Sequence, residues 1–321
     1  MNRPSAGLAA TIVALIVATT ACGDDEPSRS DVLEAFGADV AGPVFEDFAG
    51  ATATLTADTE AVCESPGEAT VAVAVATIDA TRRQWLASQA VWTGPVMERR
   101  SEAVVDWPVE VDDVEALIDR SEPGGITPDV VGNNVGADTR GLSAMRYVLT
   151  GDDVLQRLQD ERWCDYLQSA ATVIADEAGL LVGDWTESWD DGPAFVDVLG
   201  DGAATEEWLG MLVNNNIFLV HQLTEAPEDA GEVDPADPAG DRAATLAGIA
   251  GVAEALGPLL GSELSDRLDA EIAAARSAYA DGDVEVGRVR TAEVEATLAT
   301  EVASRLDVTI GFSDADGDSA G

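Results

Sequence analysis

Apolar residues recur at steps of three and four along most of the chain, the spacing that places them on one face of a helix. One such stripe runs from Leu33 to Leu55, and a second keeps helical spacing from Val71 to Trp92, a run too long for a strand. No two segments have the alternation of paired strands, so the sequence predicts an all-α protein. Further helices are predicted near 112–120, from 142 onward, and at 157–185, 205–223, 245–256, 264–279 and 284–306.

Capping and breaking residues set the expected helix boundaries. Ser30 is the predicted N-cap of the first helix. Gly42-Pro43 should kink that helix or split it into two, because proline lacks the amide that continues the hydrogen-bond ladder. Residues 121–139 contain several Gly and Pro pairs and are predicted as a long irregular loop, of the kind that is often functional or mobile.

The strongest boundary is the Asp-Asp-Gly-Pro turn at 190–193. An acidic, proline-rich linker is predicted later in the chain, at 225–240. We therefore expect two consecutive helical bundles, formed by residues 30–189 and 190–321.

The N-terminus has the layout of a secretory signal peptide. An apolar stretch from Leu8 to Val17 is shorter than the roughly 20 residues that a membrane span needs. Small residues and then Cys22 follow it, in the arrangement of a bacterial lipobox, although Thr19 stands where leucine is usual. We predict a signal peptide at 1–21, lipidation of Cys22, and an acidic tether at 22–29 that holds the exported protein off a bacterial membrane. The alternative is an ordinary signal peptide cut nearby, with Cys22 left free.

Export would place the other cysteines in an oxidising compartment. Removing Cys22 from the three cysteines leaves an even pair, so we predict a structural disulfide between Cys63 and Cys164. The alternative is two buried thiols.

The charge of the chain excludes several kinds of chemistry. All 17 basic residues are arginine and 61 residues are acidic, which gives a net charge of −44. Without lysine the chain has no phosphate-loop lysine and no Schiff base. The negative charge makes nucleic acid an unsuitable partner, and the single histidine, His221, excludes a multi-histidine metal site. The sequence indicates no cofactor, although a divalent cation or iron bound loosely by the carboxylates stays open.

Several motifs follow one another along nearly the whole mature chain. They are Trp85 and Trp92-Thr93-Gly94-Pro95-Val96, Asp106-Trp107-Pro108, the segments 138–149 and 161–167, and the ending 308–318. Together they resemble the imelysin-like family of bacterial envelope proteins. The resemblance implies two helical bundles with a site near their interface, an exported or lipid-anchored location, and a link to iron uptake; some members are described as metallopeptidases.

The best-known motif of this family is Gly-x-His-x-x-Glu on a helix, in which the His and the Glu share one helix face and can hold one metal ion. The resemblance aligns it with Gly141, Ser143 and Arg146, so both metal ligands are replaced. A neutral hydroxyl and a permanent cation do not suit a metal ion. We therefore expect a non-catalytic, lipid-anchored protein with a ligand-binding or iron-uptake accessory role. A metallopeptidase with Asp and Glu ligands elsewhere, and a surface scaffold for an envelope protein partner, are the alternatives.

A local concentration of arginine stands out in this acidic chain. Arginine forks and tryptophan faces suit an anionic or sugar-like ligand, such as a uronate, a carboxylate or an iron chelate. The alternative is that these arginines form ordinary salt bridges with Asp and Glu. His221, alone on an apolar helix, is expected in the core or at an interface. The candidate ligand-binding residues are Trp85, Trp92, Arg140, Ser143 and Arg146, with Arg82, Arg83, Arg99 and Arg100 in the same basic concentration.

Overall fold

A computed structural model describes residues 27–225 and 237–311. Across these residues the chain is helical, with one isolated bridge between Asp106 and Gly141 and no β-strand, which confirms the all-α prediction. The signal peptide, Cys22 and most of the predicted tether lie outside the described residues, as do the centre of the linker at 226–236 and the ending from residue 312.

The first helix continues past Gly42-Pro43 without a break. α1 (Arg29–Phe36) continues through a π-helical turn (Gly37–Ala41) into α2 (Gly42–Glu64), with helical dihedral angles throughout. The wider turn lies directly before Pro43, where the ladder loses a donor, so the chain accommodates the proline without leaving the helix. The N-cap predicted at Ser30 is wrong: Ser28 caps α1, because Asp31 completes a capping box with it.

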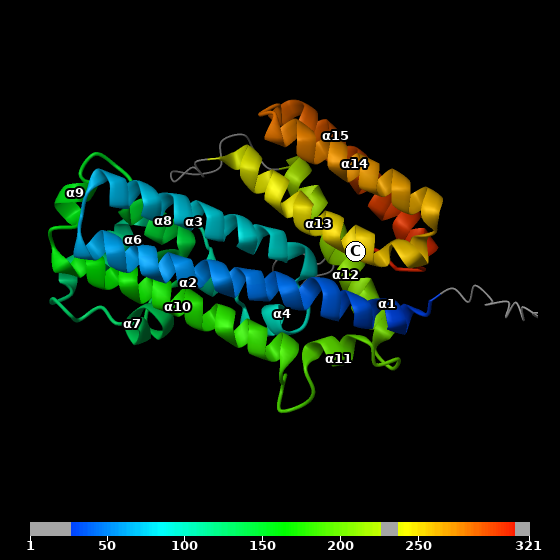
Figure 1. The fold of residues 1–321 in the computed structure, drawn as a ribbon, viewed down its shortest axis with the longest axis horizontal. Helices are drawn as coiled ribbons and strands as arrows, with labels where there is room; N and C mark the ends of the chain where they lie inside the picture. The colour runs from blue at the N-terminus through cyan, green and yellow to red at the C-terminus, as the bar shows by residue number, and fades with distance from the viewer. Residues whose placement is uncertain (1–26, 226–236, 312–321) are drawn as a thin grey trace, which may run out of the picture.

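Three long helices lie side by side in the first group: α2, α3 (Glu68–Ser88) and α10 (Glu161–Thr186) (Figure 1). The expected loop at 121–139 is partly wrong, because Thr127 caps a short helix whose first residue is Pro128. The helix expected from Arg157 starts later, at Glu161, where Asp160 supplies the cap. Short helices complete this group: α4 (Pro95–Arg99), α5 (Glu102–Val105), α6 (Val111–Arg120), α7 (Pro128–Asn133), α8 (Leu142–Val148) and α9 (Val154–Arg157).

The second group packs against the first through α13 (Pro238–Leu260), which lies against α3 and α1 (Figure 1). At this crossing a Cβ on Gly248 would come 1.9 Å from the carbonyl oxygen of Ala87, so the two helix backbones nearly touch. α13 is long and apolar enough to cross a membrane by length and composition, a test that the core helices of soluble proteins also pass. The helices of this group are α11 (Phe195–Leu199), α12 (Thr205–Glu225), α13 (Pro238–Leu260), α14 (Ser262–Ala280), α15 (Val284–Thr297) and α16 (Ala303–Arg305), with a π-helical turn (Leu298–Val302) before the last.

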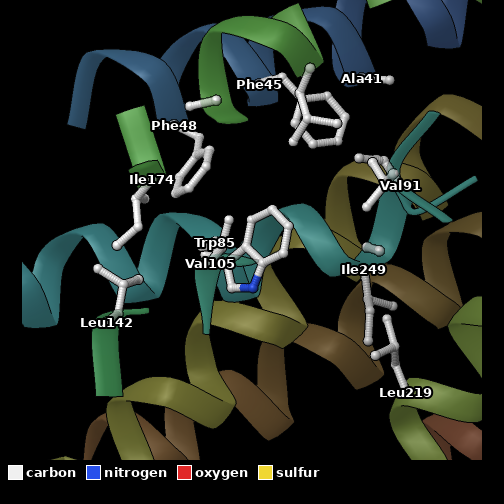
Figure 2. Packing of buried hydrophobic residues seen from close by; sticks show 14 of the residues in the cluster. Ala41, Phe45, Phe48, Trp85, Val91, Val105, Leu142, Ile174, Leu219 and Ile249 are labelled. Carbon is white, nitrogen blue, oxygen red and sulfur yellow. The ribbon is translucent and has the colours of Figure 1, made fainter. Parts of the chain in front are cut away.

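One hydrophobic core runs through both groups. Figure 2 shows Phe48 of α2 and Trp85 of α3 in the same cluster as Ile249 of α13 and Leu219 of α12. Burial of apolar area on this scale is the main stabilising contribution to such a fold. The domain boundary at 190 stays a prediction, since the shared core does not divide there.

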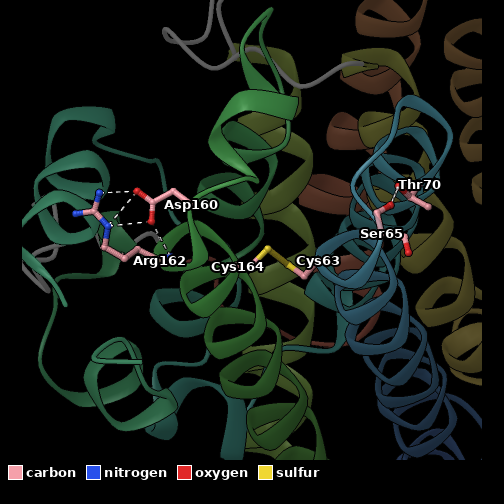
Figure 3. Close-up of a disulfide and its surroundings, with 6 residues drawn as sticks. All are labelled: Cys63, Ser65, Thr70, Asp160, Arg162 and Cys164. Atoms are coloured by element: carbon pink, nitrogen blue, oxygen red, sulfur yellow. Dashed lines mark hydrogen bonds and ion pairs between the residues drawn. A yellow bond between two sulfur atoms is a disulfide. The ribbon is translucent and has the colours of Figure 1, made fainter. Parts of the chain in front are cut away.

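The predicted disulfide is present between Cys63, near the end of α2, and Cys164, near the start of α10 (Figure 3). The Cα atoms lie 5.6 Å apart, within the usual range for a bridge, and the bond closes a loop across a sequence separation of 101 residues. It ties together two helices that are distant in sequence at one end of the first group. Beside it, the Thr70 hydroxyl donates to the Ser65 carbonyl at 2.9 Å and closes the turn between α2 and α3.

Candidate functional site

The segment aligned with the family motif begins at Gly141, a position that accepts no residue other than glycine. Gly141 has φ of 90°, in the region that side chains avoid, and a Cβ there would come 2.8 Å from the carbonyl oxygen of Val105. This close approach forms the isolated bridge between Asp106 and Gly141. Gly141 lies two residues before Ser143, so the bridge places Asp106 beside the first turn of α8.

Asp106 joins three elements through its two carboxylate oxygens. Its Oδ1 accepts hydrogen bonds from the backbone amide of Ser143 at 3.1 Å and from the Ser143 hydroxyl at 2.6 Å. Its Oδ2 accepts a hydrogen bond from Nε of Arg82 on α3 at 2.8 Å. Only 8% of the Asp106 side chain is exposed, so these bonds supply most of what water would otherwise provide.

The network then crosses to the second group. Arg82 donates from its other side to Asp241 of α13 at 2.6 Å. One guanidinium therefore lies between two carboxylates, and Arg83, next along α3, adds its charge near Asp241 at 4.0 Å. This chain of ion pairs links α8 and α3 to the start of α13.

A second pair lies along the same faces of α3 and α8. Nε of Arg146 is 2.9 Å from Oδ1 of Asp79, and both side chains are mostly buried. Asp79 and Arg82 are three residues apart on α3, as Ser143 and Arg146 are on α8, so each pair shares one helix face. Where the two faces meet, Arg146 contacts Asp79 directly, and Arg82 and Ser143 are both bound to Asp106.

Burial and charge compete within the network. Burial lowers the pKa of Arg82, but the carboxylates of Asp106 and Asp241 outweigh it and raise the pKa above its usual value. Burial raises the pKa of Asp241 above the usual carboxyl value, although the charges of Arg82 and Arg83 act in the opposite direction. The charge of Arg82 is thus stabilised by its partners despite burial, whereas the charge of Asp241 is not stabilised enough to offset its own burial.

These side chains do not fit a metal ion at the position of the motif. The Ser143 hydroxyl is bound to Asp106, and the guanidinium of Arg146 stands where the family has its glutamate. Within residues 27–225 and 237–311, no three His, Cys, Asp or Glu side chains gather into a group that could hold a metal. The arrangement can bind ions through its guanidinium groups, and it fastens three helices together.

Arg140 and Arg99 lie in other surroundings. Arg140 donates to the carbonyl oxygens of Ala103, at 2.9 Å, and of Gly132, and burial lowers its pKa. Its charge has no carboxylate bonded to it among the residues that the structure describes. Arg99 forms a two-point contact with Glu177, at 2.9 and 3.0 Å, and a weaker one with Asp184. Neither side chain joins the Asp106 network.

The tryptophans proposed for the site are packing residues. Trp85 is 1% exposed and lies against Phe48 and Trp92, with ring centroids 5.1 and 4.8 Å away. Trp92 is half-buried and donates from Nε1 to the Ser88 hydroxyl at 3.1 Å. Of the five proposed residues, the structure brings Ser143 and Arg146 together on α8 and places Trp85, Trp92 and Arg140 elsewhere.

His221 lies at an interface but outside the core. Its side chain is 46% exposed, and Nδ1 is 2.9 Å from Oε1 of Glu295 on α15. This contact joins α12 to α15, and neither helix carries a residue of the family motif.

The sequence reasoning missed the three acidic partners of the network, Asp79, Asp106 and Asp241. Asp79 and Arg82 are spaced three apart on a predicted helix, and Asp106 belongs to the Asp-Trp-Pro segment noted above. Neither signal is specific enough to distinguish one functional carboxylate from the other acidic residues, of which the chain has 61 in all. Asp241, which is distant in sequence from both, has no local signal at all.

The fold and site define an all-α protein in which two packed groups of helices are joined by an ion-pair network at the place of a family motif. The profile of the imelysin family matches residues 41–303, so the chain belongs to the imelysin family. No curated protein matches the chain with significance.

Two solved structures have a similar fold. An imelysin-like protein from Psychrobacter arcticum 273-4 is 16% identical, with a TM-score of 0.74 over 88% of this chain and 97% of the other. A protein from Parabacteroides distasonis ATCC 8503, described as an iron-regulated protein A precursor, is 14% identical, with a TM-score of 0.65 over the same shares. At these identities the likeness extends to the fold alone.

Proposed function

We propose that this protein is a non-catalytic member of the imelysin family, anchored in the cell envelope through Cys22, that binds an anionic ligand as an accessory of iron uptake. The observation that carries the proposal is the pairing of Arg146 with Asp79 and of Ser143 with Asp106, at the position where the family motif has its metal ligands. A metal-dependent reaction at this place would need a metal ion where the guanidinium of Arg146 lies.

The iron-related part of the proposal rests on the family and on one neighbour. The protein of similar fold from P. distasonis is described as iron-regulated. Iron is carried in bacterial surroundings as complexes with anionic chelators, and guanidinium forks bind carboxylate groups in two-point contacts. An arginine at the motif position suits such a complex better than it suits a bare metal ion.

A ligand of this kind would have to compete with a carboxylate of the protein. Asp79 already occupies the guanidinium of Arg146 at 2.9 Å. We infer that the anion binds by displacing Asp79, which costs part of the binding free energy. Removing the charge of Asp79 should therefore strengthen binding, and removing Arg146 should abolish it.

Isothermal titration of the full chain with ferric citrate tests this step. Asp79→Asn should bind more tightly than wild type, and Arg146→Gln should not bind. Arg290→Gln is the matched control, because Arg290 pairs with Glu293 at 2.8 Å on the exposed face of α15. No binding by wild type or Asp79→Asn, or equal binding by all four proteins, would contradict the proposed ligand site.

The non-catalytic part needs its own experiment. Purified wild type should contain no stoichiometric metal and should show no peptidase activity that a chelator removes. The double variant Ser143→His/Arg146→Glu rebuilds the family motif and should gain affinity for a divalent metal. Tight metal in wild type with chelator-sensitive cleavage of peptides would establish the metallopeptidase instead.

The anchor can be tested in cells that carry the full chain. Wild type should incorporate labelled palmitate and partition with membranes, and Cys22→Ala should do neither. An unlabelled wild type would contradict lipidation and leave an ordinary exported protein.

A further inference from the structure

The outer face of α3 forms one wall of a shallow groove that has only Asp79 in common with the site described above. The groove has a volume of about 540 Å³, and its other wall is formed by α9 and the turn before it. The lining is mainly apolar and contains no basic side chain. The lining residues are Glu68, Val71, Ala72, Val75, Ala76, Asp79, Asp152, Val154 and Leu155.

The side chains on the α3 wall have the spacing of a helix-docking surface. Ala72 and Ala76 lie one turn apart and are exposed, so the backbone of another helix can approach closely there. Val75 on α3, with Val154 and Leu155 opposite, is half-buried and provides apolar contact. The α3 wall runs from Glu68 to Asp79, which at the helical rise is roughly 17 Å, or about three turns.

The charges around the groove are all negative. Glu68 and Asp152 are exposed, and neither makes a hydrogen bond or ion pair with another described residue. Asp79, at the other end of the α3 wall, is partly neutralised by Arg146. In contrast, the acidic residues of the network are each paired with arginine. The two exposed carboxylates therefore remain available to an outside cation.

We propose that this groove docks an amphipathic helix of a protein partner, with an apolar stripe of about three turns flanked by Lys or Arg. The small and apolar side chains accept the stripe, and Glu68 and Asp152 attract the flanking cations. A second copy of this chain is the less suitable occupant, because each copy brings 61 acidic residues against 17 basic ones. The groove shares Asp79 with the proposed ligand site, but the docking argument rests on its other lining residues and does not depend on the ligand.

A labelled model peptide tests the docking in solution. The probe is an 18-residue peptide of Leu, Ala and Lys with apolar residues at helical spacing, and the reference is a peptide of the same composition in non-periodic order. Binding to the full chain is followed by fluorescence anisotropy at two salt concentrations. The periodic peptide should bind about tenfold more tightly than the reference, and more weakly at high salt.

Two double variants separate the groove from the general acidity of the surface. Ala72→Arg/Ala76→Arg should weaken binding of the periodic peptide about tenfold or more, because it fills the groove with charge. Ala270→Arg/Ala274→Arg is the matched control, since these residues are exposed and one turn apart on α14. Arginine is a good helix former, so both variants should keep the helical circular dichroism of wild type.

Three outcomes would overturn the proposal. Equal weakening by both double variants would mean attraction to the acidic surface in general. Equal binding of the two peptides would mean that the groove does not recognise an amphipathic helix. Sedimentation showing a wild-type dimer that only Ala72→Arg/Ala76→Arg dissociates would assign the groove to a second copy.

Discussion

Arg146 of α8 donates from Nε to Oδ1 of Asp79 on α3 at 2.9 Å, and only 13% and 20% of the two side chains are exposed. Three residues further along α3, Arg82 holds Asp106, which in turn holds Ser143. The two positions where the family motif has metal ligands are therefore tied to α3 by ionic contacts of this chain's own. At this place α8 and α3 are held together by contacts between guanidinium and carboxylate groups.

Removal of Arg146 should leave Asp79 without its main cation. We expect Arg146→Met to lower the free energy of unfolding by about 1–2 kcal/mol, less than for a fully buried pair because both side chains keep some contact with water. The double variant Asp79→Asn/Arg146→Met should recover part of this loss, because no uncompensated charge remains. Urea denaturation followed by circular dichroism measures both.

Arg290→Met is the matched control for Arg146→Met. Arg290 and Glu293 are about half exposed, at 47% and 46%, so the control should lower stability less than Arg146→Met does. A loss at Arg146 no larger than at Arg290 would mean that the ion pair on α8 contributes little to the fold.

The disulfide should contribute strongly to stability because it joins segments 101 residues apart. Loss of a native disulfide commonly costs about 2–5 kcal/mol, and long loops lie toward the upper end in the chain-entropy description. We expect Cys63→Ser/Cys164→Ser, or wild type in reductant, to unfold at lower urea with helical content retained in water. Mass spectrometry of the non-reduced protein should show neither cysteine open to alkylation; two reactive thiols would contradict the bridge.

Asp160 should make the start of α10 sensitive to acid. Its pKa is lowered below the usual 3.8 by the side-chain hydrogen bond from Arg162 and by the Arg162 backbone amide (Figure 3). Because the folded-state pKa lies below that of the unfolded chain, this stability is fully present above pH 3.8 and is lost as the pH falls through the folded-state value.

An NMR titration of the Asp160 carboxyl should give a midpoint below 3.8. Asp160→Asn keeps an acceptor at the cap but loses the charge, so it should be less stable than wild type at pH 7 and equally stable once Asp160 is protonated. A midpoint at or above 3.8, or a stability difference that does not change with pH, would contradict the assignment.

Helical periodicity was sufficient to predict the long helices, because their buried stripes are regular over many turns. Trp85 shows how the same pattern could have been used further: it falls on the stripe of Val71 and Ile78, and all three are buried in the structure. The spacing therefore predicts a packing role for Trp85, and its place in a ligand site stays a prediction. Similarly, Thr127 followed by Pro128 is a helix start in sequence, although the surrounding glycines suggested a loop.

The site was predictable only in part. The motif position identified Ser143 and Arg146, and the parity of the cysteines identified the disulfide. The pairing of Arg82 with Asp241 depends on how α13 crosses α3, a long-range relationship that no local pattern records. Asp241 reaches Arg82 only because the helices approach closely at Gly248.

Gly248 should therefore tolerate no side chain. A Cβ there would lie 1.9 Å from the Ala87 carbonyl oxygen, and because that atom is backbone, α13 would have to move away from α3. Overpacking of this kind costs about 1–3 kcal/mol, which should exceed the gain in helix propensity from alanine. In α10, Gly179 has nothing within 4 Å of an added Cβ, so Gly179→Ala should stabilise by about 0.5–1 kcal/mol. Urea denaturation of both variants would show opposite signs; equal stabilisation would mean that the two helices cross less closely than the structure places them.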